Sequence, residues 1–300
     1  MEKAFLYKDV VKTFSDFKLG PLNLDLEPGM ALGLVGPNGA GKTTSMQCLV
    51  GLLRADAGEM RVFGRPNDLR RPEWKLDIGY VGDIHAFYER WTAAQNLRFL
   101  SQFYPGWSGE KESELIRRFK LPLNKRAKDL STGNRVKLSL VSAIARSPRL
   151  LLLDEPTSGI DPVVRAEVLD VLFEVLETGE RAIFYATHIL PEISRLADEL
   201  AFIDEGQIWL HTPTENLNER WRMLTFRLAR KEVAFESVVS HQREGDDHQV
   251  ISSDYKATAN QLKALGAENI QDVRMSIEEI AVQILKGDHD VENDKSGNRV

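Results

Sequence analysis

The sequence contains a single cysteine, Cys48, among its 300 residues. One thiol excludes an internal disulfide and the zinc sites built from several cysteines, and it makes a reducing cytoplasm the expected compartment. No apolar run reaches the roughly 18 to 20 residues that a membrane-spanning helix needs, and the N-terminus lacks the apolar core of a signal peptide. If the protein works at a membrane, another chain is expected to supply the spans.

An excess of basic residues is also missing. Lys and Arg number 39 against 45 Asp and Glu, which gives a formal net charge of −6. Because phosphate backbones call for a basic surface, we expect no nucleic acid partner. Apolar residues make up 42% and charged residues 28%, a balance typical of a folded globular chain rather than a disordered one.

The apolar pattern predicts an α/β fold. Three short runs, 31–35, 150–153 and 182–187, are continuously apolar, as buried parallel strands are. Residues 4–11 and 22–26 alternate instead, which predicts two further strands. Helical periods dominate residues 88–145, and we expect the aromatic residues of segment 88–119 to lie mostly in the core.

A phosphate-binding loop follows the first buried strand. The sequence matches G-x-x-x-x-G-K-[ST] at every fixed position and precedes a helical pattern, as the motif requires. Glycines let backbone N–H groups converge on phosphate oxygens, the lysine reaches the β- and γ-phosphates, and the threonine hydroxyl is a ligand for Mg²⁺. A glycine-rich turn that holds a lysine by chance is the alternative. The expected nucleotide-binding residues are Gly36, Pro37, Asn38, Gly39, Ala40, Gly41, Lys42, Thr43 and Thr44.

Two carboxylates, Asp154 and Glu155, end the second buried run. Ligands bind at the carboxyl ends of strands in a doubly wound sheet, so we expect Asp154 to hold Mg²⁺ and Glu155 to polarise an attacking water. An acidic first turn of a helix is the alternative interpretation.

Leu130-Ser-Thr-Gly-Asn134 stands just before a helical segment, 20 residues ahead of the second buried run. By itself it would be a helix cap. Together with the phosphate loop and the acidic pair, it resembles the Leu-Ser-Gly-Gly-Gln signature of the ATP-binding cassettes of ABC transporters, and the resemblance spans roughly residues 1–215. It implies that Ser131, Thr132, Gly133 and Asn134 reach the γ-phosphate of ATP held by a second subunit.

Further residues follow in the family's order. Ser158, Gly159 and Asp161 resemble the loop through which two cassettes touch, and His188 resembles the switch histidine that contacts the γ-phosphate. The resemblance therefore implies that Glu155, His188 and Lys42 are the catalytic residues.

The family pattern assigns two further positions. Phe14 falls where the family places an aromatic ring that stacks on adenine, although a strand residue in the core is the alternative. Asp83 stands where the family usually has a glutamine that meets Mg²⁺ and senses the membrane partner. The Mg²⁺ ligands implied are thus Thr43, Asp154 and Asp83.

The signature departs from the family, with Thr132 in place of glycine and Asn134 in place of glutamine. A β-branched residue restricts the backbone, so we expect looser approach to phosphate. Slower hydrolysis, or a pairing in which one of two composite sites works better, would follow.

The resemblance implies a phosphate-loop NTPase (RecA-like) core with an antiparallel β-subdomain and a helical subdomain. The nucleotide-binding domain is expected over 1–215, with the helical part at about 88–145, a small α+β accessory domain over 216–286 and a flexible tail over 287–300.

It also implies an ATPase that uses ATP and Mg²⁺ and pairs with a second cassette, either a copy of itself or a paralogue. A separately encoded membrane permease, of the exporter type, would hold it at the inner face of the cell membrane, and some aromatic residues of segment 88–119 would line a groove for a coupling helix of that permease. The rival class is a soluble protein of the same superfamily acting on ribosomes or DNA. Such proteins usually carry two cassettes or long coiled coils, and this chain has one cassette and no sustained heptads.

Overall fold

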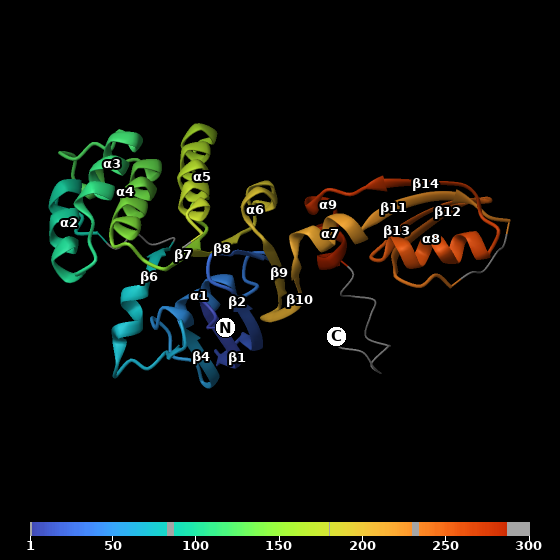
Figure 1. Ribbon diagram of the computed structural model, residues 1–300, viewed down its shortest axis with the longest axis horizontal. Helices are drawn as coiled ribbons and strands as arrows, with labels where there is room; N and C mark the ends of the chain where they lie inside the picture. The colour runs from blue at the N-terminus through green and yellow to red at the C-terminus, as the bar shows by residue number, and fades with distance from the viewer. Residues whose placement is uncertain (1, 83–86, 180, 230–233, 287–300) are drawn as a thin grey trace. The chain divides into compact units, whose positions relative to one another are not determined.

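The computed structural model describes residues 2–82, 87–179, 181–229 and 234–286. The chain divides into two compact units, residues 1–211 and 212–300 (Figure 1). Within the described ranges, every helix is too short or too polar to cross a bilayer.

A six-stranded sheet forms the centre of the first unit, in the order β10-β9-β3-β8-β7-β6. The pairs from β9 to β6 are parallel, and every residue of β3, β7 and β8 is buried, as the continuous apolar runs predict. The strands are β3 (Ala31–Val35), β6 (Ile78–Val81), β7 (Leu150–Asp154), β8 (Ala182–Thr187), β9 (Glu199–Asp204) and β10 (Gln207–Pro213).

An antiparallel sheet, in the order β2-β1-β4-β5, packs against the central sheet. The rings of Phe5 on β1 and Phe184 on β8 stack at a centroid distance of 4.8 Å, which joins the two sheets in one core. The strands are β1 (Phe5–Thr13), β2 (Lys18–Leu26), β4 (Ala57–Val62) and β5 (Arg65–Pro66).

Three helices, α2 (Ala93–Leu100), α3 (Gly109–Phe119) and α4 (Thr132–Ala145), lie together within the first unit (Figure 1). The remaining helices of this unit follow strands of the central sheet. They are α1 (Lys42–Leu49), α5 (Pro162–Glu177) and α6 (Leu190–Leu196), with short 3₁₀ turns η1 (Pro72–Asp77), η2 (Ser101–Phe103) and η3 (Ala127–Asp129) elsewhere.

The second unit has its own sheet, in the order β12-β13-β11-β14. Leu262 on α8 packs against Leu224, Phe226 and Val250 of the sheet, so this unit has a separate core. Its elements are α7 (Thr214–Arg220), β11 (Arg222–Arg227), β12 (Val238–Glu244), β13 (Asp247–Ser252), α8 (Tyr255–Ala264), β14 (Glu268–Arg274) and α9 (Ile277–Lys286). The mixed α/β fold predicted from the sequence is confirmed by both units.

Candidate functional site

The register of the central sheet brings three segments to one edge. Val35 at the end of β3 pairs with Thr187 on β8, and Asp154 at the end of β7 pairs with Ala186. The phosphate loop, the acidic pair and His188 therefore leave the sheet side by side, where a doubly wound sheet binds its ligands.

The phosphate loop depends on glycine at two points. A Cβ on Gly36 would lie 2.1 Å from the carbonyl oxygen of Ile203, so the loop passes too close to β9 for any side chain. Gly41 caps α1 with a φ of 109°, a left-handed conformation that favours glycine, and no side chain caps this helix. The N-terminal end of α1 thus faces the loop with its backbone N–H groups, as phosphate binding requires.

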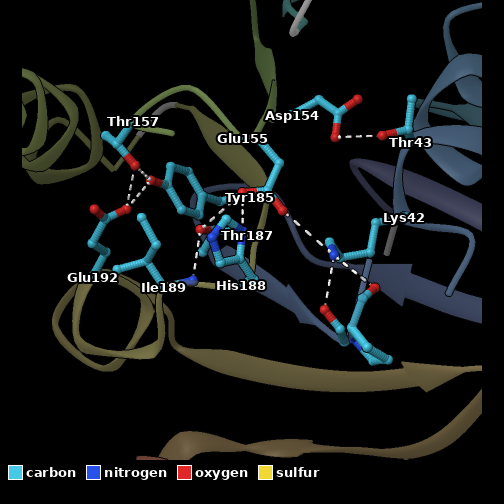
Figure 2. A network of polar contacts seen from close by, with 12 residues as sticks. Lys42, Thr43, Asp154, Glu155, Thr157, Tyr185, Thr187, His188, Ile189 and Glu192 are labelled. Carbon is cyan, nitrogen blue, oxygen red and sulfur yellow. Dashed lines mark hydrogen bonds and ion pairs between the residues drawn. The ribbon is translucent and has the colours of Figure 1, made fainter. Parts of the chain in front are cut away.

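Lys42 and Thr43 begin α1 and point toward the acidic pair (Figure 2). Lys42 is 5% exposed, and its Nζ donates to the carbonyl oxygens of Gly36 at 2.8 Å and Pro37 at 3.1 Å. The Thr43 hydroxyl donates to Oδ1 of Asp154 at 3.0 Å. The start of α1 thereby places the ammonium group of Lys42 next to the Thr43 hydroxyl, which is paired with the Asp154 carboxylate of β7.

Glu155 lies between Lys42 and His188 (Figure 2). Its Oε1 is 3.4 Å from Nζ of Lys42, and its Oε2 is 2.8 Å from Nδ1 of His188. Its φ is 51°, a left-handed conformation that costs a non-glycine residue free energy and is concentrated at functional sites. The sequence predicts these three residues as catalytic, and the structure brings them together.

A pocket of about 450 Å³ opens between these groups, lined by Phe17, Asn38, Gly39, Gly41, Lys42, Thr43, Thr44, Glu155, Ser158 and His188. Phe17 was not expected there. A Cβ on Gly41 would lie 3.0 Å from Cζ of Phe17, so this ring closes the pocket beside the loop. Phe14, the residue expected to stack on adenine, is 42% exposed and does not line the pocket. The signal for Phe17 was a second aromatic residue in the same turn, where Phe14 N–H donates to the Phe17 carbonyl at 2.8 Å.

The donor set fits Mg²⁺. The Thr43 hydroxyl and the Asp154 carboxylate are hard oxygen ligands held 3.0 Å apart, and Mg²⁺ usually takes one or two protein carboxylates and completes its shell with phosphate and water. Asp83, the third expected ligand and the expected sensor, lies outside the described residues. Cys48 on α1 is buried, which raises the pKa of its thiol to about 11 and leaves it a packing residue.

The two loops expected to face a second cassette both begin helices. Ser131 caps α4 and accepts from Asn134 N–H at 3.3 Å, and Thr132 is the first helical residue, so its β-branched side chain meets no left-handed strain. Asp161 caps α5 by accepting from Val163 and Val164 N–H at 3.1 and 3.0 Å. Ser131 and Thr132 are exposed, and so are Gly159 and Asp161.

An aromatic cluster on the helical part of the unit is more exposed than the sequence predicts. Tyr88, Trp91 and Phe103 are 53, 37 and 59% exposed, so the expectation that these rings are mostly core is wrong for them. Tyr88 stacks on Trp91 at a centroid distance of 4.4 Å, and Phe99 makes edge contacts with both of these rings and with Phe103. The four rings form one apolar surface patch.

Known proteins resemble this chain over the same region. The profile of the ABC transporter family matches residues 19–158. The ABC transporter ATP-binding protein YtrB of Bacillus subtilis (strain 168) is 32% identical over 68% of this chain and 69% of its own length. The bacitracin transport ATP-binding protein BcrA of Bacillus licheniformis is 30% identical over 74% of each chain. The Nod factor export ATP-binding protein I of Cupriavidus metallidurans is 33% identical, over 62% of this chain and 63% of its own.

Solved structures share the fold. An ATP-binding subunit of an ABC transporter matches with a TM-score of 0.65 at 24% identity, over 72% of this chain and 92% of its own. A dimeric, post-hydrolysis cassette bound to ADP and phosphate matches with a TM-score of 0.63 at 23% identity, over 70% of this chain and 98% of its own. Because the two Bacillus proteins are at least 30% identical over more than two thirds of both chains, the family follows directly: this chain is an ATP-binding subunit of the ABC transporter family and carries its ATPase domain.

Proposed function

We propose that this chain hydrolyses ATP with Glu155 as the general base, and that the composite site closes only when a second cassette supplies its signature loop. The observation that carries the proposal is the position of Glu155, whose two oxygens contact Lys42 on one side and His188 on the other. A carboxylate so placed can accept the proton of a water that attacks the γ-phosphate.

The other residues of the site would orient the attacking water and neutralise the charge of the phosphates. Lys42 would exchange its contacts with the Gly36 and Pro37 carbonyls for the β- and γ-phosphate oxygens, and His188 would hold the attacking water beside Glu155. Thr43 and Asp154 would hold Mg²⁺, which neutralises charge on the phosphates when bound. Phe14 would stack on the adenine, and Phe17 would pack beside Gly41 of the phosphate loop.

We infer further that the chain drives a separate membrane permease of the exporter type from the inner face of the membrane. The exposed patch formed by Tyr88, Trp91, Phe99 and Phe103 supports a docked partner, because contiguous exposed aromatic rings mark interaction sites. The names of relatives, among them Nod factor export, linearmycin resistance and bacitracin transport, support export.

The test is steady-state ATP hydrolysis by the purified full chain with Mg²⁺. Glu155→Gln should lower kcat by about 10²- to 10⁴-fold, the range of general-base catalysis, while ATP binding measured by calorimetry persists. Glu110→Gln, an exposed glutamate in the first turn of α3, is the matched control and should turn over like the wild type. A wild-type chain that does not bind ATP, or whose turnover survives Glu155→Gln, contradicts the proposal.

A further inference from the structure

A buried carboxylate outside the pocket lies close to the catalytic residues. Glu192 on α6 is 3% exposed, and a charge so deeply buried costs free energy unless other groups compensate it. Three side chains from three different segments do so here. The lining of the nucleotide pocket includes neither Glu192 nor any of these three side chains.

Two hydroxyl groups converge on one oxygen of Glu192 (Figure 2). Thr157 and Tyr185 each donate to Oε2 at 2.5 Å, and their own oxygens are 3.1 Å apart. Burial and the adjacent Glu192 charge raise the pKa of Tyr185 well above its usual value, so the phenol keeps its proton and donates. Oε2 of Glu192 thus accepts a hydrogen bond from each of the two hydroxyl groups.

The second oxygen of Glu192 faces α5. Nε of Arg165 is 3.1 Å from Oε1, as an ion pair whose angle is not that of a hydrogen bond. Arg165 lies one turn after Asp161, the residue that caps α5 and ends the loop expected to touch a second cassette. Glu192 therefore connects α6 to the start of α5.

The same cluster fixes both ends of the catalytic contact. Thr157 is two residues after Glu155, and Tyr185 is three residues before His188, so the Glu192 carboxylate joins the two segments that carry the catalytic pair. Closer to the pocket, Thr187 donates to Oε2 of Glu155 at 3.4 Å and accepts from Ile189 N–H at 2.9 Å. The Thr157, Tyr185 and Glu192 side chains are buried, whereas the His188 side chain that contacts Glu155 is 47% exposed.

We propose that Glu192 is a positioning residue for ATP hydrolysis, which clamps the Glu155–Ser158 turn to the end of β8 through Thr157 and Tyr185 and so holds Glu155 against His188. The inference rests on the proposed function, because it requires Glu155 to be the base. Through Arg165 the cluster also contacts α5, one turn after the dimer-contacting loop.

The test compares variants of the full chain in steady-state hydrolysis and thermal unfolding. Glu192→Leu should lower kcat by at least about tenfold and leave KM for ATP within about twofold, because small misplacement of a catalytic group costs rate rather than binding. Glu192→Gln keeps an acceptor oxygen, so its kcat should fall less than that of Glu192→Leu. Glu199→Leu is the matched control. This carboxylate lies on β9 of the central sheet, and its partner is His211, which is outside the Glu192 cluster.

A triple variant separates positioning from folding. The triple variant combines Thr157→Val, Tyr185→Phe and Glu192→Leu, so no hydroxyl that donated to Glu192 is left buried without an acceptor. The side chain of Arg165 is about one third exposed and can be hydrated instead. We expect this variant to recover the Tm that Glu192→Leu loses while kcat stays low. Recovery of kcat along with Tm, or undiminished kcat in Glu192→Leu, overturns the inference while wild-type turnover upholds the proposed function. A wild type without Glu155-dependent turnover overturns both.

Discussion

At the scale of single residues, the two phenylalanines near the phosphate loop have different surroundings. Phe14 exposes 42% of its surface and carries Lys12 Nζ 5.6 Å from its ring centroid. Phe17 is half-buried against Gly41 and lines the pocket. An exposed ring is available to stack on a base, whereas a packed ring shapes the loop that holds the phosphates.

Phe14→Ala should therefore weaken ATP binding by about five- to a hundredfold, the worth of one base–aromatic stack, and leave inorganic tripolyphosphate binding unchanged. Phe17→Ala should weaken both ligands, because it loosens the packing beside Gly41. Calorimetric titration of each variant with ATP and with tripolyphosphate measures the difference. Equal losses for both ligands in Phe14→Ala would contradict a role for that ring in adenine binding.

Lys42 and Glu155 are predicted as catalytic because each belongs to a local sequence pattern, whereas His188 is predicted only through the family resemblance. Lys42 stands in a loop motif, and Glu155 directly follows an apolar strand. These two residues are expected to lie close together because each follows the carboxyl end of a parallel strand. Glu192 could not be predicted so, because a glutamate on a short helix usually faces water, and Tyr185 in a buried run usually belongs to the apolar core. Only the strand register and the start of α6 bring their polar atoms together.

At the scale of elements, the second unit is held at the start of α8 by Asp254. Its Oδ1 accepts from Ala257 N–H at 3.2 Å, and its Oδ2 accepts from Arg220 on α7 at 2.9 Å. The backbone hydrogen bond first, and Arg220 as well, hold the pKa of Asp254 below its usual value. One carboxylate thus caps α8 and ties it to α7.

Asp254→Ala should destabilise α8 by about 1 kcal/mol, the usual worth of a helix cap, and Asp254→Asn should lose less because the amide still caps. A carboxyl whose folded pKa is lowered stabilises the fold above its unfolded pKa, near 3.9, and this contribution disappears as the pH falls through the folded value. The stability of α8 should therefore differ between the wild type and Asp254→Asn at pH 7, and the two stabilities should converge in acid.

Hydrogen exchange of the α8 amides, followed by mass spectrometry across this pH range, measures the effect. Asp246→Asn, in the exposed turn between β12 and β13, is the matched control and should leave α8 unchanged. If the difference in α8 exchange between the wild type and Asp254→Asn grew in acid, the pKa of Asp254 would be raised by folding rather than lowered, and the stabilising role of its carboxylate would be refuted.

At the scale of the whole molecule, the sequence predicts the α/β class well because its buried strands are uninterrupted apolar runs. It does not predict which aromatic residues of the helical part are exposed. Aromatic residues at helical spacing indicate a core by default, yet Tyr88, Trp91 and Phe103 gather on the surface. Which face of a helix is covered depends on the packing of the neighbouring elements, and local periodicity does not contain that information.

The exposed signature and dimer-contacting loops lead to the last prediction, on assembly. If Ser131 meets the γ-phosphate of a second copy, the Glu155→Gln chain, which binds ATP but does not hydrolyse it, should double its 33.9 kDa mass in light scattering when Mg²⁺ and ATP are added. Ser131→Arg in the same background should keep it monomeric, because the long side chain fills the space that phosphate needs. Ser113→Arg, an exposed serine on α3, is the control and should still dimerise. An unchanged mass in a chain that binds ATP would contradict self-pairing and assign the second signature to a paralogue, since the loop and pocket of one cassette alone leave the site half built.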